Sequence, residues 1–244
     1  MFKRISVFLY GVVSYAVFLA TFLYAVGFIG NFAVPATLDG TPLMSTGQAV
    51  IVDMLLLGIF ALQHSIMARP FFKRWLTRFI PESAERSTYV LMSSLALIAL
   101  FVHWQPLGGI AWDIQDPNVR AVLFILFGLG WLLVLVSTFL INHFDLFGLR
   151  QVWLQLRGKP YQPLRFGTPG PYKLVRHPLY LGWLFAFWAT PTMTGTHLLF
   201  AFLTSAYIFV AIQLEERDLI DSLGDDYRRY RNRVPMIIPG PRRA

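Results

Sequence analysis

The sequence contains no cysteine among its 244 residues. Disulfide bonds, thiolate metal sites and cysteine nucleophiles are therefore excluded, and no metal site is predicted. Charged residues are also scarce, at 14% of the chain, whereas apolar residues make up 56%. Soluble domains carry about 25% charged residues. The composition therefore indicates an integral membrane protein.

The apolar residues fall into runs of the length that a membrane requires, which is about 20 residues for a transmembrane helix. Four runs lie before residue 142, and a fifth is interrupted by Thr190–Thr196. This interrupted run predicts a helical hairpin over 178–214, followed by a cytoplasmic C-terminal helix. The predicted fold class is all-α, a polytopic integral membrane helical bundle. The expected segments are Ile5–Ile29, Gln48–Met67, Thr88–Trp104, Val119–Ile141, Leu179–Thr190 and His197–Leu214.

The net charge of +8 follows the positive-inside pattern of membrane proteins. If the N-terminus is cytoplasmic, the inside segments hold 20 of the 21 Lys and Arg residues, and Arg120 is the exception. The pattern predicts a membrane protein with six membrane-embedded segments and both termini in the cytoplasm. The basic surplus therefore indicates topology and a lipid bilayer as partner, and nucleic-acid binding is not expected. The oligomeric state is left open.

One domain is expected over residues 1–244, because no internal repeat or low-complexity segment divides the chain. We divide it into a four-helix transmembrane part over 1–141 and a cofactor-binding part over 142–244. The first apolar run lacks a small-residue cleavage site before polar sequence, so it is predicted to be an anchor and not a removed signal peptide.

Ionisable residues cluster at the predicted cytoplasmic ends of four segments: His64, the Asn142–Asp145 segment, His177 and the pair Glu215–Glu216. Polar groups at membrane segments are costly and often mark function. Simpler interpretations exist for each group. The alternative for His64 is an ordinary histidine at the membrane interface. The alternative for His143 is a residue at a helix end, and the alternative for the glutamates is an exposed run of charges.

The two ends of the hairpin carry complementary chemistry. Pro178 fits the first turn of a helix, so Arg176 and His177 lie at an N-terminus whose free amides suit an anionic group. Tyr180 is expected on the same face, and Gly182 is expected to allow close approach of a neighbour. At the other end, Glu215 and Glu216 suit an ammonium group or a ribose edge.

Two further segments are interpreted from their composition. The loop over 167–172, rich in glycine and proline, is expected to be non-helical. The segment Phe147–Leu156 predicts a short amphipathic helix at the interface, or one that lines the site.

Several motifs together resemble a known family. YKLVRHPLYLGW, a glutamate about 38 residues after the histidine, G-x-x-Y-x-x-Y and a closing V-P resemble the membrane methyltransferases that include isoprenylcysteine carboxyl methyltransferase and phospholipid N-methyltransferases. The resemblance covers Leu164 to Pro239. QHSIMARPFFKRW and INHFDLFGLRQVWL resemble the branch with bacterial methanethiol S-methyltransferases and NnrU-like proteins.

The resemblance implies S-adenosylmethionine as methyl donor, bound from the cytosol. Carried over by position, it implies donor contacts from Tyr172, His177, Pro178, Leu179, Tyr180 and Glu215, and from the loop with Leu164, Phe166 and Gly167, whose residues match the family poorly. The charge pattern of the hairpin ends predicts that Arg176 and Glu216 also contact the donor.

One departure from the resemblance concerns the acceptor. The carboxyl methyltransferases carry an arginine one helical turn before the glutamate, where this chain has Ala211. A buried carboxylate without a partner is costly, which favours a small neutral or thiol acceptor. The resemblance to the methanethiol branch implies methanethiol, converted to dimethyl sulfide, as the acceptor. A thiol needs a base, for which we expect His143 or His64, with Asp145 or Asn142 orienting it. Asn142, Phe144 and Trp153 are expected to contact the acceptor.

Three alternatives stay open. The first is a methyltransferase acting on a prenylated or lipid acceptor. The second is a membrane reductase, although the sequence has no dinucleotide glycine fingerprint. The third is a membrane accessory or transport protein with a vestigial donor site.

Overall fold

The computed structural model describes residues 1–164 and 166–240. It contains five helices that are long and apolar enough to cross a membrane, together with one shorter apolar helix. This confirms the predicted polytopic helical bundle, and each helix overlaps the run expected for it. The five helices are α1 (Phe2–Gly30), α2 (Thr46–Ala68), α4 (Glu82–His103), α5 (Pro117–Ile141) and α9 (Gly195–Leu223), and the shorter one is α8 (Pro178–Trp188).

The chain forms two compact units. The first comprises Met1–Gly108 and Asn142–Pro163, and the second comprises Gly109–Ile141 and Leu164–Ala244, of which the structure describes all but residues 165 and 241–244. Helix α5 thus groups with the C-terminal segments, whereas the predicted division at residue 141 placed it with the first three helices.

In the first unit, α4 packs against both α1 and α2. The predicted amphipathic segment is helical as α7 (Leu149–Leu156), which packs against α1. The two meet at Gly11, where an added Cβ would lie 2.5 Å from a methyl group of Val152. Two short helices complete this unit, α3 (Pro70–Leu76) and α6 (His143–Leu146).

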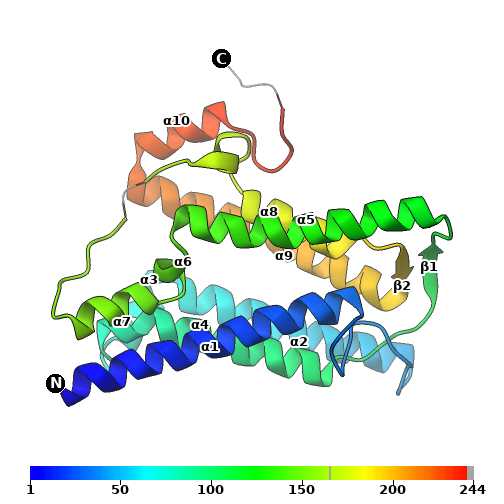
Figure 1. The fold of residues 1–244 in the computed structure, drawn as a ribbon, viewed down its shortest axis with the longest axis horizontal. Coiled ribbons are helices and arrows are strands. Elements are labelled where there is room, and N and C mark those ends of the chain that lie inside the picture. Colours follow the sequence, from blue (N-terminus) through cyan, green and yellow to red (C-terminus); the bar gives the residue numbers. More distant parts are fainter. Residues whose placement is uncertain (165, 241–244) are drawn as a thin grey trace. The chain divides into compact units, whose positions relative to one another are not determined.

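In the second unit, α5 and α8 run side by side (Figure 1). An added Cβ at Gly182 would lie 2.7 Å from the carbonyl oxygen of Gly130, and a Cβ at Gly130 would lie 2.8 Å from the oxygen of Gly182. The two glycines therefore let the helix backbones touch, as small residues do in membrane helix pairs. The predicted close approach at Gly182 is confirmed.

The predicted hairpin turn also contains a short strand. Residues Thr192–Thr194 form β2, which pairs antiparallel with β1 (Ile110–Asp113). The indole of Trp112 in β1 donates a hydrogen bond to the carbonyl oxygen of Thr190. This two-stranded sheet, which the sequence did not suggest, joins the two connections of the second unit, 109–116 and 189–194.

Two predictions of local structure are wrong. Helix α9 does not end at Leu214 but continues through the paired glutamates to Leu223, because nothing before Gly224, with φ 58°, interrupts it. The predicted C-terminal helix follows as α10 (Asp225–Arg233). The loop over 167–172 is not wholly non-helical, since η1 (Gly170–Lys173) is a 3₁₀ turn with a proline at its start, where no amide hydrogen bond is needed.

Candidate functional site

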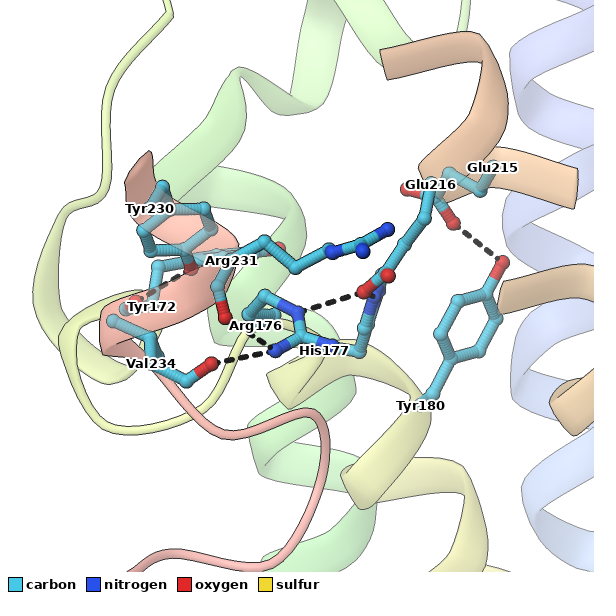
Figure 2. Close-up of polar contacts among 9 residues, drawn as sticks. All are labelled: Tyr172, Arg176, His177, Tyr180, Glu215, Glu216, Tyr230, Arg231 and Val234. Carbon is cyan, nitrogen blue, oxygen red and sulfur yellow. Dashed lines mark hydrogen bonds and ion pairs between the residues drawn. The ribbon is translucent and has the colours of Figure 1, made fainter. Parts of the chain in front are cut away.

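The two ends of the hairpin meet in the second unit (Figure 2). Oε1 of Glu216 accepts a hydrogen bond of 2.7 Å from Nε of Arg176 and lies 3.0 Å from Nε2 of His177. All three side chains are buried or nearly so. The segment before α8 and the C-terminal part of α9 are thus joined by a buried ion pair, and the predicted meeting of the two hairpin ends is confirmed.

Arg176 also holds the C-terminal segment. Its Nη1 donates to the carbonyl oxygens of Arg231, at 3.0 Å, and Val234, at 2.6 Å. The backbone amides of Arg176 and His177 donate to the carbonyl oxygens of Pro235 and Met236. The guanidinium therefore connects three parts of the chain, the entrance to α8, helix α9 and the end of α10 (Figure 2).

The neighbouring glutamate has a different partner. The hydroxyl of Tyr180 donates a hydrogen bond of 2.9 Å to Oε2 of Glu215. The side chain of Glu215 is only partly buried, whereas Glu216 is 6% exposed. Glu216 is therefore neutralised within the protein by Arg176, whereas the hydrogen bond to Glu215 comes from a neutral phenol.

Tyrosines form the side of the site next to α10. Tyr230 donates a hydrogen bond of 2.6 Å to the carbonyl oxygen of Tyr172, and the ring of Phe166 contacts the rings of Tyr227 and Tyr230. Burial raises the pKa of Tyr230 to about 12 and also raises the pKa values of Tyr172 and Tyr227. All three phenols are therefore neutral hydrogen-bonding groups at neutral pH.

Tyr227 is 1% exposed, and its hydroxyl has no hydrogen-bond partner in the described part of the chain. A buried polar group without a partner is costly, which makes this hydroxyl a point where a ligand would restore a hydrogen bond. The sequence analysis included Tyr227 in the G-x-x-Y-x-x-Y motif but assigned it no role.

A cavity of about 320 Å³ borders one of these tyrosines, Tyr230. Its size lies within the range of about 300–1,000 Å³ that is typical of small-molecule sites. Aromatic rings and cations dominate its lining. The residues that line it are Phe166, Thr168, Lys173, Asp226, Arg229, Tyr230, Arg233 and Val234.

The other residues expected to contact the donor lie nearby in the sequence. Pro178 occupies the start of α8 with His177 as N-cap, as predicted, and Pro178 is buried. Leu179 is partly buried in the first turn, and Leu164 is 41% exposed. Gly167 lies in the segment before η1, where an added Cβ would meet no described atom within 4 Å.

In the first unit, the imidazole of His143 pairs with a residue that the sequence analysis did not single out. Nε2 of His143 lies 2.8 Å from the hydroxyl of Tyr15 in α1. His143 is 3% exposed, and burial lowers its pKa below the usual value of 6.5. The imidazole is therefore neutral at neutral pH. Tyr15 is one of three tyrosines in the apolar helix α1, and nothing in the sequence distinguished it as the partner of His143.

The residues expected to orient His143 have other partners. The carboxylate of Asp145 accepts hydrogen bonds from Arg150, at 2.7 Å, and from Tyr161, at 3.2 Å. The side chain of Asn142 accepts from the amide of Asp145 and so caps α6. These bonds give both residues a role in shaping the segment around His143.

His64 lies in a separate hydrogen-bonded set. Its Nε2 lies 2.8 Å from the hydroxyl of Tyr89, and its Nδ1 lies 3.1 Å from that of Ser93, both in α4. Of the residues expected to contact the acceptor, Phe144 makes edge contact with the ring of His143, whereas Trp153 packs against Phe8.

Comparison with known proteins gives close relatives over almost the whole chain. The chain is 54% identical over 241 residues to "Methanethiol S-methyltransferase" of Mycobacterium tuberculosis, covering 99% of each protein. It is 56% identical over 237 residues to the protein of that name from Crocosphaera subtropica, covering 97% of this chain and 93% of the relative. "Nurim" of Sus scrofa is 32% identical over 185 residues, 70% of each chain. No family model matches, and no solved structure matches.

Proposed function

The chain belongs to the methanethiol S-methyltransferase family, and we propose that it transfers a methyl group from S-adenosylmethionine to methanethiol, which gives dimethyl sulfide. The observation that carries this proposal is the 54% identity over 99% of both chains to a relative of that name. The bacterial relatives and the five apolar helices support a site in the bacterial inner membrane. The positive-inside pattern supports cytoplasmic termini.

The second unit offers groups that fit the methyl donor, which supplies an electrophilic methyl group on a sulfonium. The carboxylate of Glu215 suits its ammonium group or its ribose hydroxyls. The buried hydroxyl of Tyr227, which has no partner in the described chain, suits a polar atom of the nucleoside. The rings of Phe166 and Tyr230 border a cavity of about 320 Å³ and suit a base. Lys173 at the same cavity suits the donor's carboxylate.

Arg176, His177 and Glu216 have a supporting role in this proposal. Their side chains satisfy one another, and Arg176 also binds two carbonyl oxygens of the C-terminal segment. We therefore assign them to holding Glu215 and the α10 tyrosines in place. A group that is held by its neighbours costs less to align when the ligand binds.

The absence of a cation one turn before Glu215 favours a small neutral molecule as the methyl acceptor. Ala211 lies one turn before Glu215 on α9, so this position offers no cation for a carboxylate. Methanethiol needs only an apolar environment and a group that takes its proton. A free alkyl thiol has a pKa of about 8.5 or above and attacks as the thiolate, and a neutral histidine is suited to take the proton. We propose His143 or His64 for this role.

The central experiment uses the full-length protein in detergent or lipid with donor labelled in the methyl group. Acceptors are methanethiol, a longer alkyl thiol, a prenylated cysteine and a phospholipid, and the headspace is analysed for dimethyl sulfide. Labelled dimethyl sulfide from methanethiol alone is expected. Transfer only to the prenylated or lipid acceptor, or to none of the four, would overturn the assignment.

The role of the base is tested by His143→Gln and His64→Gln. The variant that lacks the base should lose about 100-fold or more in kcat, since general-base catalysis contributes about 10²–10⁴-fold. Donor binding by calorimetry should be unchanged in both variants. Wild-type rates in both would remove histidine base catalysis from the proposal while leaving the methyl transfer intact.

A further inference from the structure

The first unit contains two histidine–tyrosine pairs, and they differ in their surroundings. His143 lies on the short helix α6, and its Nε2 is 2.8 Å from the hydroxyl of Tyr15 on α1. His64 lies on α2, and hydroxyl groups of Tyr89 and Ser93 approach its two ring nitrogens. Both of these hydroxyl groups lie on α4, so the contacts of His64 with them join α2 to α4.

Aromatic rings enclose the His143–Tyr15 pair. The ring of His143 lies 4.8 Å from that of Phe147 and 5.5 Å from that of Phe144, measured between centroids. Phe18 stacks on Phe147 at 3.8 Å. This enclosure leaves His143 3% exposed, so solvent contributes little to stabilising a charge on the imidazole.

A buried imidazole that accepts a proton becomes an imidazolium with N–H groups on both nitrogens. Burying such a charge is costly unless its N–H groups find acceptors. The oxygen of Tyr15 lies where it accepts the Nε2–H, whichever nitrogen takes up the new proton. Two charged groups close to His143 in the sequence, Asp145 and Arg150, form an ion pair with each other, and Tyr161 also donates to Asp145.

We propose that Tyr15 is the positioning residue for the proton acceptor His143. Its hydroxyl fixes the orientation of the imidazole and accepts the Nε2–H once the ring is protonated. In the step it supports, the S–H bond of the thiol breaks, the proton goes to the imidazole, and the electron pair stays on sulfur as the thiolate. The imidazolium later returns the proton to water. The inference rests on the proposed thiol methyltransferase function and names the residue that supports its base.

The test compares three tyrosine variants in the full-length enzyme. Tyr15→Phe removes the hydroxyl and keeps the ring. Tyr10→Phe is the matched control, because Tyr10 lies on the same helix and its hydroxyl also makes one hydrogen bond, of 2.9 Å, to Thr88. Tyr89→Phe removes the corresponding hydroxyl from the His64 pair.

Tyr15→Phe should lower kcat about tenfold or more, because hydrogen bonds to charged groups contribute about 1.5–3 kcal/mol, or about 10- to 150-fold. The KM for the donor should not change. The imidazolium loses its acceptor, so the acid limb of the pH–rate profile should move to lower pH by about one unit. A purely structural contact would not move this limb. Tyr10→Phe should keep the wild-type rate and profile.

Two results overturn the inference while the methyl transfer stands: a wild-type rate and profile in Tyr15→Phe, or a shifted acid limb in Tyr89→Phe and not in Tyr15→Phe. If the wild-type protein makes no dimethyl sulfide, the proposed function itself fails. A measurement on the wild type covers the case in which Tyr15→Phe does not fold. ¹⁵N spectra of the five histidines, assigned with His143→Gln, should show a hydrogen-bonded Nε2 for His143. A signal like that of the exposed His103 would refute the pair.

Discussion

The hydroxyl of Tyr180 donates a hydrogen bond of 2.9 Å to Oε2 of Glu215, 35 residues later in the chain. The next residue of α9, Glu216, points its carboxylate to Arg176 and His177 instead (Figure 2). Two adjacent carboxylates of the same helix thus have different partners, and substitutions at the two positions can separate their contributions.

Glu215→Gln and Glu216→Gln form a matched pair. Glu215→Gln should weaken donor binding about 10- to 100-fold with an unchanged melting temperature, because a charged hydrogen-bonding partner of the ligand is lost. Glu216→Gln leaves the buried Arg176 without its counter-charge and should destabilise the protein by about 3 kcal/mol. Calorimetry with the donor and thermal unfolding in detergent measure the two effects. Equal losses of affinity and stability in both variants would contradict the division of roles.

Arg176→Lys should not preserve the function of Arg176, although the charge is kept. One guanidinium reaches Glu216 and two carbonyl oxygens, of Arg231 and Val234, whereas an ammonium group lacks this fork geometry. We expect faster hydrogen exchange at the amides of Arg176 and His177, which bond the segment after α10. Arg228→Lys is the control, since its ion pair with Asp225 is exposed. Unchanged protection in Arg176→Lys would show that the backbone bonds alone hold this segment.

The contact between α5 and α8 predicts that a Gly→Ala substitution destabilises the protein at one glycine of this helix pair and is tolerated at another. A Cβ at Gly182 would lie 2.7 Å from a backbone oxygen of α5, so Gly182→Ala should cost about 1–3 kcal/mol. A Cβ at Gly128 would meet no described atom within 4 Å. Gly128→Ala should therefore be neutral, or stabilise by up to about 1 kcal/mol through helix propensity. Thermal unfolding compares the two, and a stable Gly182→Ala variant would be inconsistent with backbone contact.

Stability should depend on the protonation of His143. Burial lowers its pKa in the folded protein, so below about pH 6.5 the unfolded chain binds more protons than the folded one. The free energy of unfolding therefore falls as the pH drops through 6.5 towards the folded pKa, by about 1.4 kcal/mol for each unit of pKa depression. Melting curves from about pH 7.5 to 5.5 should show this slope in the wild type and in His103→Gln, and a smaller one in His143→Gln. The same slope in all three proteins would assign it to other groups.

The absence of cysteine makes the proposed topology directly measurable. Single cysteines at Thr41 and Lys159, both exposed, are expected on opposite sides of the membrane. An impermeant maleimide added to intact cells with a permeable outer membrane should label Thr41→Cys and not Lys159→Cys, because the positive-inside pattern places Lys159 in the cytoplasm. Labelling of Lys159→Cys under these conditions would reverse the orientation and move the proposed donor site to the other side.

The sequence predicted the features that depend on hydrophobicity and on local backbone chemistry. Each long apolar run is a helix, because backbone groups in lipid must bond within their own segment. Pro178 begins α8 because its missing amide costs nothing there. The close approach of a neighbour at Gly182 followed from the absence of a side chain, although only the structure identifies this neighbour as α5. The meeting of His177 with the paired glutamates followed from the hairpin.

Only the tertiary structure decided which side chain pairs with which. The sequence predicted donor contacts for both Glu215 and Glu216, whereas the structure pairs Glu216 with Arg176 and His177. It also offered Asp145 or Asn142 as the residue that orients His143, where the structure brings Tyr15 to the imidazole. Such pairings join residues 35 to 128 positions apart. They depend on how each helix is rotated about its axis when it packs, and apolar residues on nearly all faces of a membrane helix leave that rotation unspecified.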